Sequence, residues 1–248
     1  MKRKPKVYVI KLSKRMLILL GLIIFLVLSF IVLKDSKVSR IFKYQSNGTI
    51  VIDPGHGGID GGTGDKEGLL EKDINLDVAS KLKKELLVEG FKVVMTREKD
   101  QSLEEFSDIN ASRYRRDLDA RKSIVNKNDP IVFVSIHVNS SKKTSAKGIK
   151  VYYYPNSYEG KELAENICQS IDLNVYEKYL RDDTLKAEVL SEDYFILRET
   201  EFPGVLVEIG FITNPEENKL LQDEKYKTKV AFAIKKGIIQ YLSVQGDG

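Results

Sequence analysis

The sequence predicts one α/β domain in which a twisted, mostly parallel or mixed sheet carries helices on both faces, preceded by one N-terminal transmembrane helix. Three observations predict this arrangement. An unbroken apolar run stands near the amino terminus, short β-branched runs recur after it, and amphipathic helical patterns alternate with those runs. With 248 residues, of which 42% are hydrophobic and 31% charged, the chain is long enough for one sizeable core and a short appendage.

Residues 16–33 are all apolar, Gly or Ser, and as a helix they would extend roughly 27 Å, close to the thickness of a bilayer's hydrocarbon core. Residues 1–15 contain basic but no acidic residues, whereas mixed charges follow the run. The positive-inside rule therefore predicts a single-pass protein of the cytoplasmic membrane, with residues 1–15 inside and the domain on the extracytoplasmic side. A cleaved signal peptide, whose apolar region is usually about 7 to 15 residues, is the alternative and also exports the domain.

The basic flank explains the formal net charge of +4. Removing its seven Lys and Arg from the 40 in the chain leaves 33 basic residues against 36 acidic ones, a net −3. The remaining domain has no basic excess, so we expect no nucleic-acid partner. Cys168 is the only cysteine, which excludes a disulfide within the chain, and its helical pattern predicts a small buried side chain.

The polar residues 34–48 are expected to form a stalk, and residues 49–243 the folded domain. Short apolar, β-branched runs bounded by turn residues predict five strands, at 49–53, 92–96, 131–137, 149–154 and 204–209. Broad apolar stripes predict four helices between and after them, at 72–87, 118–126, 160–179 and 226–242. No appended wall-binding module is expected, because the α/β pattern continues almost to residue 248. In such sheets functional residues tend to lie in loops at the strand ends.

Both histidines of the chain stand at the carboxyl end of a predicted strand. His56 follows the first strand in DPGHGGIDGG, and His137 ends IVFVSIH. A lone histidine is more often a satisfied structural residue, but two in matching positions favour a shared metal site. The glycines around His56 allow backbone to approach a ligand closely, and the loop lacks the Lys-Ser/Thr ending of a phosphate-binding P-loop.

Two imidazoles and one carboxylate leave a fourth position on zinc for water, which is the usual catalytic arrangement. Glu71, at the start of the helix 72–87, is the candidate carboxylate, although helix N-terminal charge complementarity is an alternative role. Glu208 ends an otherwise apolar run and is the candidate acid/base, with a carboxylate satisfied by backbone donors as the alternative. Asn139 is expected either to bind substrate or to close an Asx-turn, and Asp53 to support a metal ligand.

The motifs DPGHGG with the following Glu71, SIHVNS around His137, and FPGVLVEIGFITNPEE around Glu208 occur in one order along the chain. Together they resemble the zinc-dependent N-acetylmuramoyl-L-alanine amidases (amidase type 3) over about residues 49–242. The resemblance implies that His56, Glu71 and His137 hold Zn²⁺ and that Glu208 is the catalytic acid/base. It also implies the substrate, the amide between N-acetylmuramic acid and L-alanine of the peptidoglycan stem peptide.

The short architecture is similar to that of the CwlD-type, germination-specific amidases of spore-forming bacteria, which act in forming the muramic lactam of the spore cortex. Some family members carry an inserted helix that covers the zinc. Segments 101–116 and 181–192 are too short to make such a helix, so we expect control by a separate regulatory partner protein.

The sequence leaves two other functions open. Two histidines and two glutamates also suit another zinc-dependent wall hydrolase, such as a peptidase or a deacetylase. A non-catalytic scaffold that holds wall strands or a partner near the membrane is a third possibility, which the intact set of candidate site residues disfavours.

Overall fold

The computed structural model describes residues 14–16, 19–23, 25 and 47–245. The chain divides into two compact units, Met1–Tyr44 and Gln45–Gly248. Most of the expected anchor at 16–33, most of the basic segment 1–15 and nearly all of the stalk at 34–48 lie outside the described residues. Within the described residues, no helix combines the length and the apolar character that a membrane crossing requires.

A six-stranded mixed sheet with the order β2-β1-β3-β6-β4-β5 forms the centre of the second unit. Its strands are β1 (Thr49–Pro54), β2 (Lys92–Met95), β3 (Val132–Asn139), β4 (Lys150–Tyr153), β5 (Glu188–Ser191) and β6 (Gly204–Phe211). The first four in that order are parallel, whereas β4 runs antiparallel to β6 and pairs in parallel with β5. The expected mostly parallel or mixed sheet is therefore confirmed.

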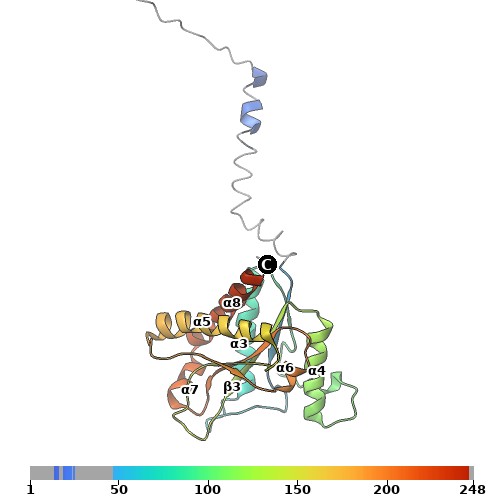
Figure 1. The fold of residues 1–248 in the computed structure, drawn as a ribbon, viewed down its shortest axis with the longest axis vertical. Helices are drawn as coiled ribbons and strands as arrows, with labels where there is room; N and C mark the ends of the chain where they lie inside the picture. Colours follow the sequence, from blue (N-terminus) through green and yellow to red (C-terminus); the bar gives the residue numbers. More distant parts are fainter. Residues whose placement is uncertain (1–13, 17–18, 24, 26–46, 246–248) are drawn as a thin grey trace, which may run out of the picture. The chain divides into compact units, whose positions relative to one another are not determined.

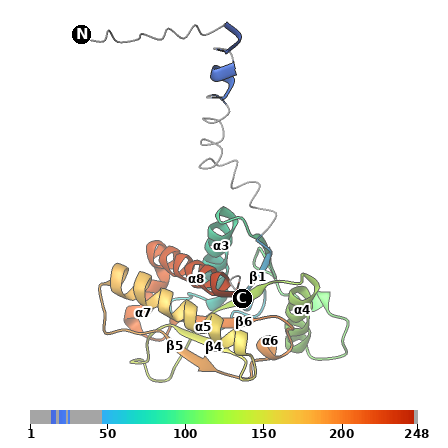
Figure 2. The same ribbon diagram turned by 45° about the horizontal axis from the view of Figure 1, so that its top comes forward.

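Helices cover both faces of this sheet (Figures 1 and 2). On one face the larger core packs α3 (Glu71–Val88), α5 (Tyr158–Ile171) and α8 (Glu224–Gln245) against alternate strand residues such as Ile50 and Val134. On the other face a smaller cluster joins Val51 and Phe133 to residues of two further helices, α4 (Arg113–Lys127) and α6 (Phe195–Arg198). Successive side chains of a strand point to opposite faces of the sheet, and both faces are covered by apolar clusters. The central strands are therefore continuous apolar runs in the sequence.

The structure extends or corrects the expected elements in several places. The edge strand β5, the one-turn helix α6 and α7 (Pro215–Gln222) were not predicted, because each is too short for a periodic signal. The predicted helix 160–179 is α5 followed by the π-helical η2 (Asp172–Leu180). α4 begins five residues before the predicted 118, since its first turn faces solvent and follows the Ser112 cap. Cys168 is buried and free, as expected.

A buried polar network ties the carboxyl ends of the central strands to α4. Asp53 is 1% exposed, and its Oδ1 accepts hydrogen bonds from Arg121 Nη1 (2.7 Å) and Thr96 Oγ1 (2.6 Å). Its Oδ2 accepts a hydrogen bond from Ser135 Oγ at 2.7 Å. Burial alone would raise the pKa of Asp53, but the guanidinium of Arg121 and the two hydroxyl donors outweigh burial and lower this pKa to about 2.

This network predicts how the stability of the fold depends on pH. The folded pKa of Asp53 lies below its ordinary value of 3.8, so its contribution is present above pH 3.8 and is lost as the pH falls through 2. The chain should lose about 2 kcal/mol of unfolding free energy from this group over that window. Asp53→Asn should lower the unfolding free energy at pH 7 by about 3 kcal/mol and flatten the pH dependence.

Urea unfolding followed by circular dichroism between pH 2 and pH 7 measures both effects. Asp108→Asn, at an exposed position, is the matched control and should unfold like the unmodified chain. Equal acid dependence in the Asp53→Asn variant and the unmodified chain would contradict the role assigned to Asp53.

Candidate metal centre

Three side chains from distant parts of the sequence meet at the carboxyl edge of the sheet. His56 follows β1, Glu71 is the first residue of α3, and His137 lies near the end of β3. One potential ligand atom from each side chain lies within 4.8 Å of the other two. Glu71 Oε1 lies 3.2 Å from His56 Nε2 and 2.9 Å from His137 Nδ1. The two imidazole rings are 5.0 Å apart, edge to face. The structure thus brings together the three residues that the sequence singled out.

Two glycines of the loop after β1 make this approach possible. A Cβ on Gly55 would lie 2.2 Å from the His137 ring, and a Cβ on Gly62, which has φ +66°, would lie 2.5 Å from Glu71 Oε2. Either clash would push a candidate ligand out of place. The spacing of glycines in DPGHGGIDGG is therefore a steric requirement of the site.

The orientation of His56 is fixed on its outer side. Its Nδ1 lies 2.8 Å from Asp60 Oδ2, which leaves Nε2 directed at Glu71. A carboxylate on the far nitrogen of a ligating imidazole sets its tautomer and raises its basicity. Asp60 was not among the residues expected from the sequence, although its position four residues after His56 in the same glycine loop could have indicated this contact.

Two buried arginines hold the backbone of this loop. Arg97 donates hydrogen bonds to the carbonyl oxygens of Pro54 (3.0 Å), Gly55 (2.9 Å) and Lys72 (2.8 Å). Because Lys72 follows Glu71, one guanidinium fastens the His56 loop to the helix that carries the candidate carboxylate.

Arg121 completes this support by donating to the carbonyl oxygens of Pro54 (2.8 Å) and His56 (2.6 Å). Asp53 contacts neither histidine in the hydrogen-bond network. It supports His56 only indirectly, through its ion pair with Arg121.

Glu71 is almost fully buried and fully hydrogen-bonded. Besides the two imidazoles, Oε1 accepts from the backbone N–H of Val138 (3.1 Å) and from Asn75 Nδ2 (3.3 Å), and Oε2 accepts from the N–H of Thr63 (2.8 Å). Burial would raise the pKa of Glu71, but hydrogen bonds from both histidines hold it well below its usual range. The carboxylate is therefore ionised at neutral pH.

The pKa of His56 reflects this negative charge. Burial lowers the pKa of His56, yet hydrogen bonds and attraction from Glu71 and Asp60 outweigh burial and raise the pKa to about 9. A positive charge between the imidazoles and the carboxylate is thus strongly favoured, whether protons or a divalent cation supply it. Two imidazole nitrogens and one carboxylate oxygen are also the donor set that zinc accepts in hydrolytic enzymes.

Glu208 lies beside this cluster, directly opposite His137 in the register of β3 and β6. Paired residues of neighbouring strands project to the same face, so both side chains lie on one side of the sheet. Its Oε2 atom is buried and has no hydrogen-bond partner among the described residues. Burial raises the pKa of Glu208 to about 7, against the smaller lowering effect of His137. A carboxyl group with this pKa can both accept and donate a proton at neutral pH.

Asn139 makes a local hydrogen bond, but it is not the one that the expected Asx-turn requires. Its Oδ1 accepts from the N–H of Ser140 at 2.8 Å, one residue on rather than the two of an Asx-turn. Its role in binding substrate stays a prediction. Segment 101–116 contains η1 (Glu104–Phe106) and the start of α4, and segment 181–192 contains β5, so neither forms an inserted helix of its own.

Comparison with known proteins agrees with this geometry. The family model described as N-acetylmuramoyl-L-alanine amidase matches residues 50–240. The germination-specific N-acetylmuramoyl-L-alanine amidase of Bacillus subtilis (strain 168) is 36% identical over 232 residues, which cover 92% of this chain and 94% of the relative.

Solved structures are similar as well. The CwlD amidase from Clostridioides difficile, in complex with the GerS lipoprotein, matches with a TM-score of 0.72 and 38% identity, over 80% of this chain and 100% of that chain. The catalytic domain of CwlV from Bacillus (Paenibacillus) polymyxa var. colistinus matches with a TM-score of 0.66 and 31% identity, over 79% and 98%. The chain therefore belongs to the N-acetylmuramoyl-L-alanine amidase family, whose members hydrolyse the amide between N-acetylmuramic acid and L-alanine in peptidoglycan.

Proposed function

We propose that His56, Glu71 and His137 hold a zinc ion and that Glu208 is the general acid/base of this N-acetylmuramoyl-L-alanine amidase. The observation that carries the proposal is the convergence of two imidazole nitrogens and one ionised carboxylate oxygen within 4.8 Å, with an unpaired carboxyl oxygen beside them. No hydrogen bond in the described residues accounts for that oxygen, which suits a group kept for the reaction.

When bound, zinc supplies a Lewis acid that polarises the scissile carbonyl and makes water acidic enough to attack at neutral pH. Glu208 accepts the proton of the attacking water and later donates a proton to the departing amine of L-alanine. The amide bond breaks, leaving a carboxylate on the lactyl group of the sugar and a free amino terminus on the stem peptide. Asp60, Arg97 and Arg121 keep the His56 loop in place during these steps.

We also propose a role in forming the spore cortex, in association with a regulatory partner protein. The similarity to a germination-specific amidase over nearly the whole length of both chains supports the first part. The solved complex of the similar CwlD amidase with the GerS lipoprotein supports the second. Peptidoglycan is the substrate, and the N-terminal apolar run is proposed to hold the domain on the outer side of the cytoplasmic membrane.

Glu208→Gln tests the acid/base assignment. The amide side chain keeps the size of Glu208 but cannot take up a proton, so release of stem peptides from peptidoglycan should fall by about 10²- to 10⁴-fold. The zinc content per chain should stay unchanged. Mass spectrometry of the products should show a free L-alanine amino terminus with the unmodified chain.

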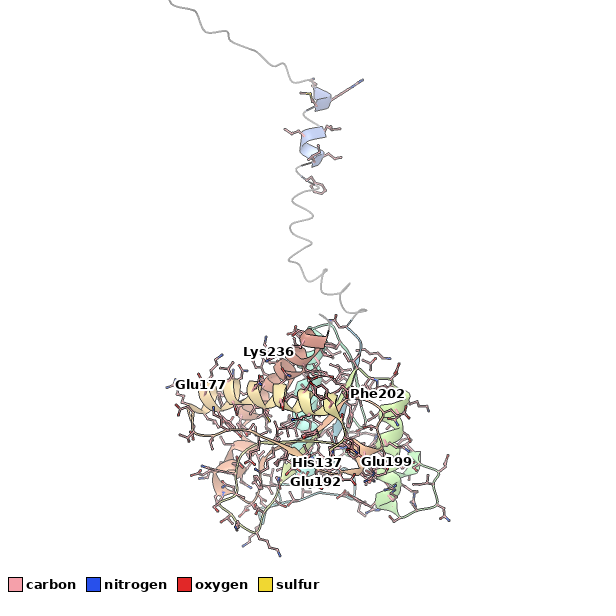
Figure 3. The ribbon with its side chains drawn as sticks, in the orientation of Figure 1. His137, Glu177, Glu192, Glu199, Phe202 and Lys236 are labelled. Carbon is pink, nitrogen blue, oxygen red and sulfur yellow. The ribbon has the colours of Figure 1, made fainter. Side chains whose placement is uncertain are left out.

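Glu177→Gln is the matched control, because Glu177 is exposed on η2 and is labelled well apart from His137 in Figure 3. This variant should retain full activity. Cleavage within the stem, or loss of acetyl groups, would identify a peptidase or a deacetylase instead. Activity of Glu208→Gln within tenfold of the unmodified chain would contradict its role.

Removing the metal should destabilise the domain. A ligand present at 100 times its dissociation constant stabilises the folded state by about 2.7 kcal/mol, so a chelator should lower the unfolding temperature by roughly 5 to 10 °C. Added zinc should restore the temperature and the activity, and differential scanning calorimetry measures the shift. His137→Ala should show little response to either addition, whereas an identical shift in that variant would place the metal elsewhere.

The proposed location has its own test. Protease added to intact cells should degrade residues 49–243 while sparing an epitope tag placed before residue 16, as immunoblotting with domain and tag antibodies would show. Permeabilised cells provide the control, in which the tag should also be lost. Protection of the domain in intact cells would place it on the cytoplasmic side of the membrane.

A further inference from the structure

A cavity of about 270 Å³ lies alongside the candidate metal centre. Its wall combines three segments: the glycine loop from His56 to Asp60, the stretch from Ser102 to Glu104, and the first turns of α4. His56 belongs both to this wall and to the ligand cluster. When the scissile amide of a substrate lies at the cluster, the part of the substrate on one side of that amide therefore extends into this cavity.

Most of the polar groups in this wall already have partners. Asp60 accepts from His56 Nδ1 and from the N–H of Gly62. Asp117 accepts from the N–H of Leu103 (2.7 Å) and from Arg121 Nε (2.6 Å). These two carboxylates are therefore occupied in holding the loop and the network beneath it.

Two groups of opposite charge in this wall have no hydrogen-bond or ion-pair partner among residues 47–245. The guanidinium of Arg113 is exposed and makes no hydrogen bond or ion pair within residues 47–245. Glu104 lines the same cavity, and its buried Oε2 has no donor among the described residues. The cavity therefore offers an unused hydrogen-bond donor group and an unused acceptor.

Arg113 lies at the positive end of the α4 dipole, a mildly unfavourable position for a cation that a bound anion would offset. The first turn of α4 contains Arg113, Arg115 and Arg116 and no acidic residue, although the positive end of the helix dipole favours acids there. The other two arginines have local partners: Arg115 lies over the Phe195 ring at 3.9 Å, and Arg116 donates to the carbonyl oxygen of Ala111 at 2.7 Å. Of these three arginines, only Arg113 lines the cavity.

We propose that this cavity is the subsite for the stem peptide, in which Arg113 binds a free carboxylate of the stem. The inference rests on the proposed amidase function. Of the two flanks of the scissile amide, the glycan offers neutral hydroxyl and acetamide groups, whereas the stem peptide carries free carboxylates. A planar guanidinium matches a carboxylate with two parallel hydrogen bonds, and a neutral sugar leaves its charge unpaired.

The remaining lining residues fit the same ligand. Ile59 and Tyr114 are 75% and 64% exposed, and they give the cavity apolar surface for the hydrocarbon parts of the stem residues. Glu104 accepts an N–H group of the stem at its unpaired oxygen. Arg113 is thus a specificity-determining residue for the flank of the substrate that leaves with the amine.

The test compares two soluble muropeptides with the zinc-loaded, full-length chain in detergent micelles. One is a disaccharide with an anionic tetrapeptide stem, and the other is the same compound with its stem carboxylates amidated. For the anionic substrate, Arg113→Gln should raise KM about tenfold, the effect of losing one charge-assisted contact, with kcat within about twofold. For the amidated substrate, the variant and the unmodified chain should have equal KM values.

Arg115→Gln is the matched control, since it removes the same charge two residues further along α4 and outside the cavity wall. It should leave the KM for the anionic substrate unchanged. Arg113→Lys, which keeps the charge but loses the planar fork, should raise KM less than Arg113→Gln does.

Equal KM values of the unmodified chain and Arg113→Gln for the anionic substrate would overturn the subsite. A KM increase that is the same for both muropeptides would also overturn it, because the contact would then lie with the glycan. If the unmodified chain cleaves neither muropeptide while it binds zinc, the proposed function itself fails, which separates the two outcomes.

Discussion

The site depends on one buried carboxylate held between two imidazoles. Burying Glu71 without partners would be strongly unfavourable, and five donor groups offset that cost: the two histidines, two backbone N–H groups and Asn75. The position of Glu71 at the amino terminus of α3 adds a favourable interaction with the helix dipole. Because the donors come from the glycine loop, β3 and α3, this single charge also fastens three segments to one another.

The loop that carries His56 needs separate support. His56 has a positive φ of 61°, which costs a residue with a side chain roughly 1 kcal/mol or more. Arg97 and Arg121 hold the carbonyl oxygens of this loop, and Asp53 holds Arg121. The unfavourable backbone conformation of His56 persists because rigid, buried side chains hold the loop in place. Such strain is typical of functional sites whose geometry is set before the substrate binds.

Two glutamates within the same site acquire opposite proton affinities from their surroundings. The donors around Glu71 keep it ionised and suit it to bind a cation. Glu208 has no donor for its Oε2, so burial raises its pKa to about 7 and suits it to transfer protons. The surroundings of Glu71 stabilise the charged carboxylate and those of Glu208 do not, which is why we propose different roles for two chemically identical side chains.

The sequence by itself determined the α/β class, the strand that His56 follows and the strands that carry His137 and Glu208. It also singled out these three residues and Glu71 as the candidate site residues. These features follow from local patterns: β-branched runs, glycines around a histidine, and an acid at the end of an apolar run. It also predicted five of the six strands, but the short edge strand β5 and the π-helical end of the 160–179 helix lacked a periodic signal.

Only the tertiary structure decided which side chains support the site and what surrounds it. Asp60, Asn75 and Arg121 contact the candidate ligands or their backbone, and Arg97 contacts the backbone of residues next to them. In the sequence these four are ordinary polar residues of a loop or a helix. The cavity beside His56 likewise exists only because 102–104 and the start of α4 fold against the glycine loop. Hydrogen-bond partners and pKa values are set by distances between segments far apart in the chain, and local sequence patterns do not contain those distances.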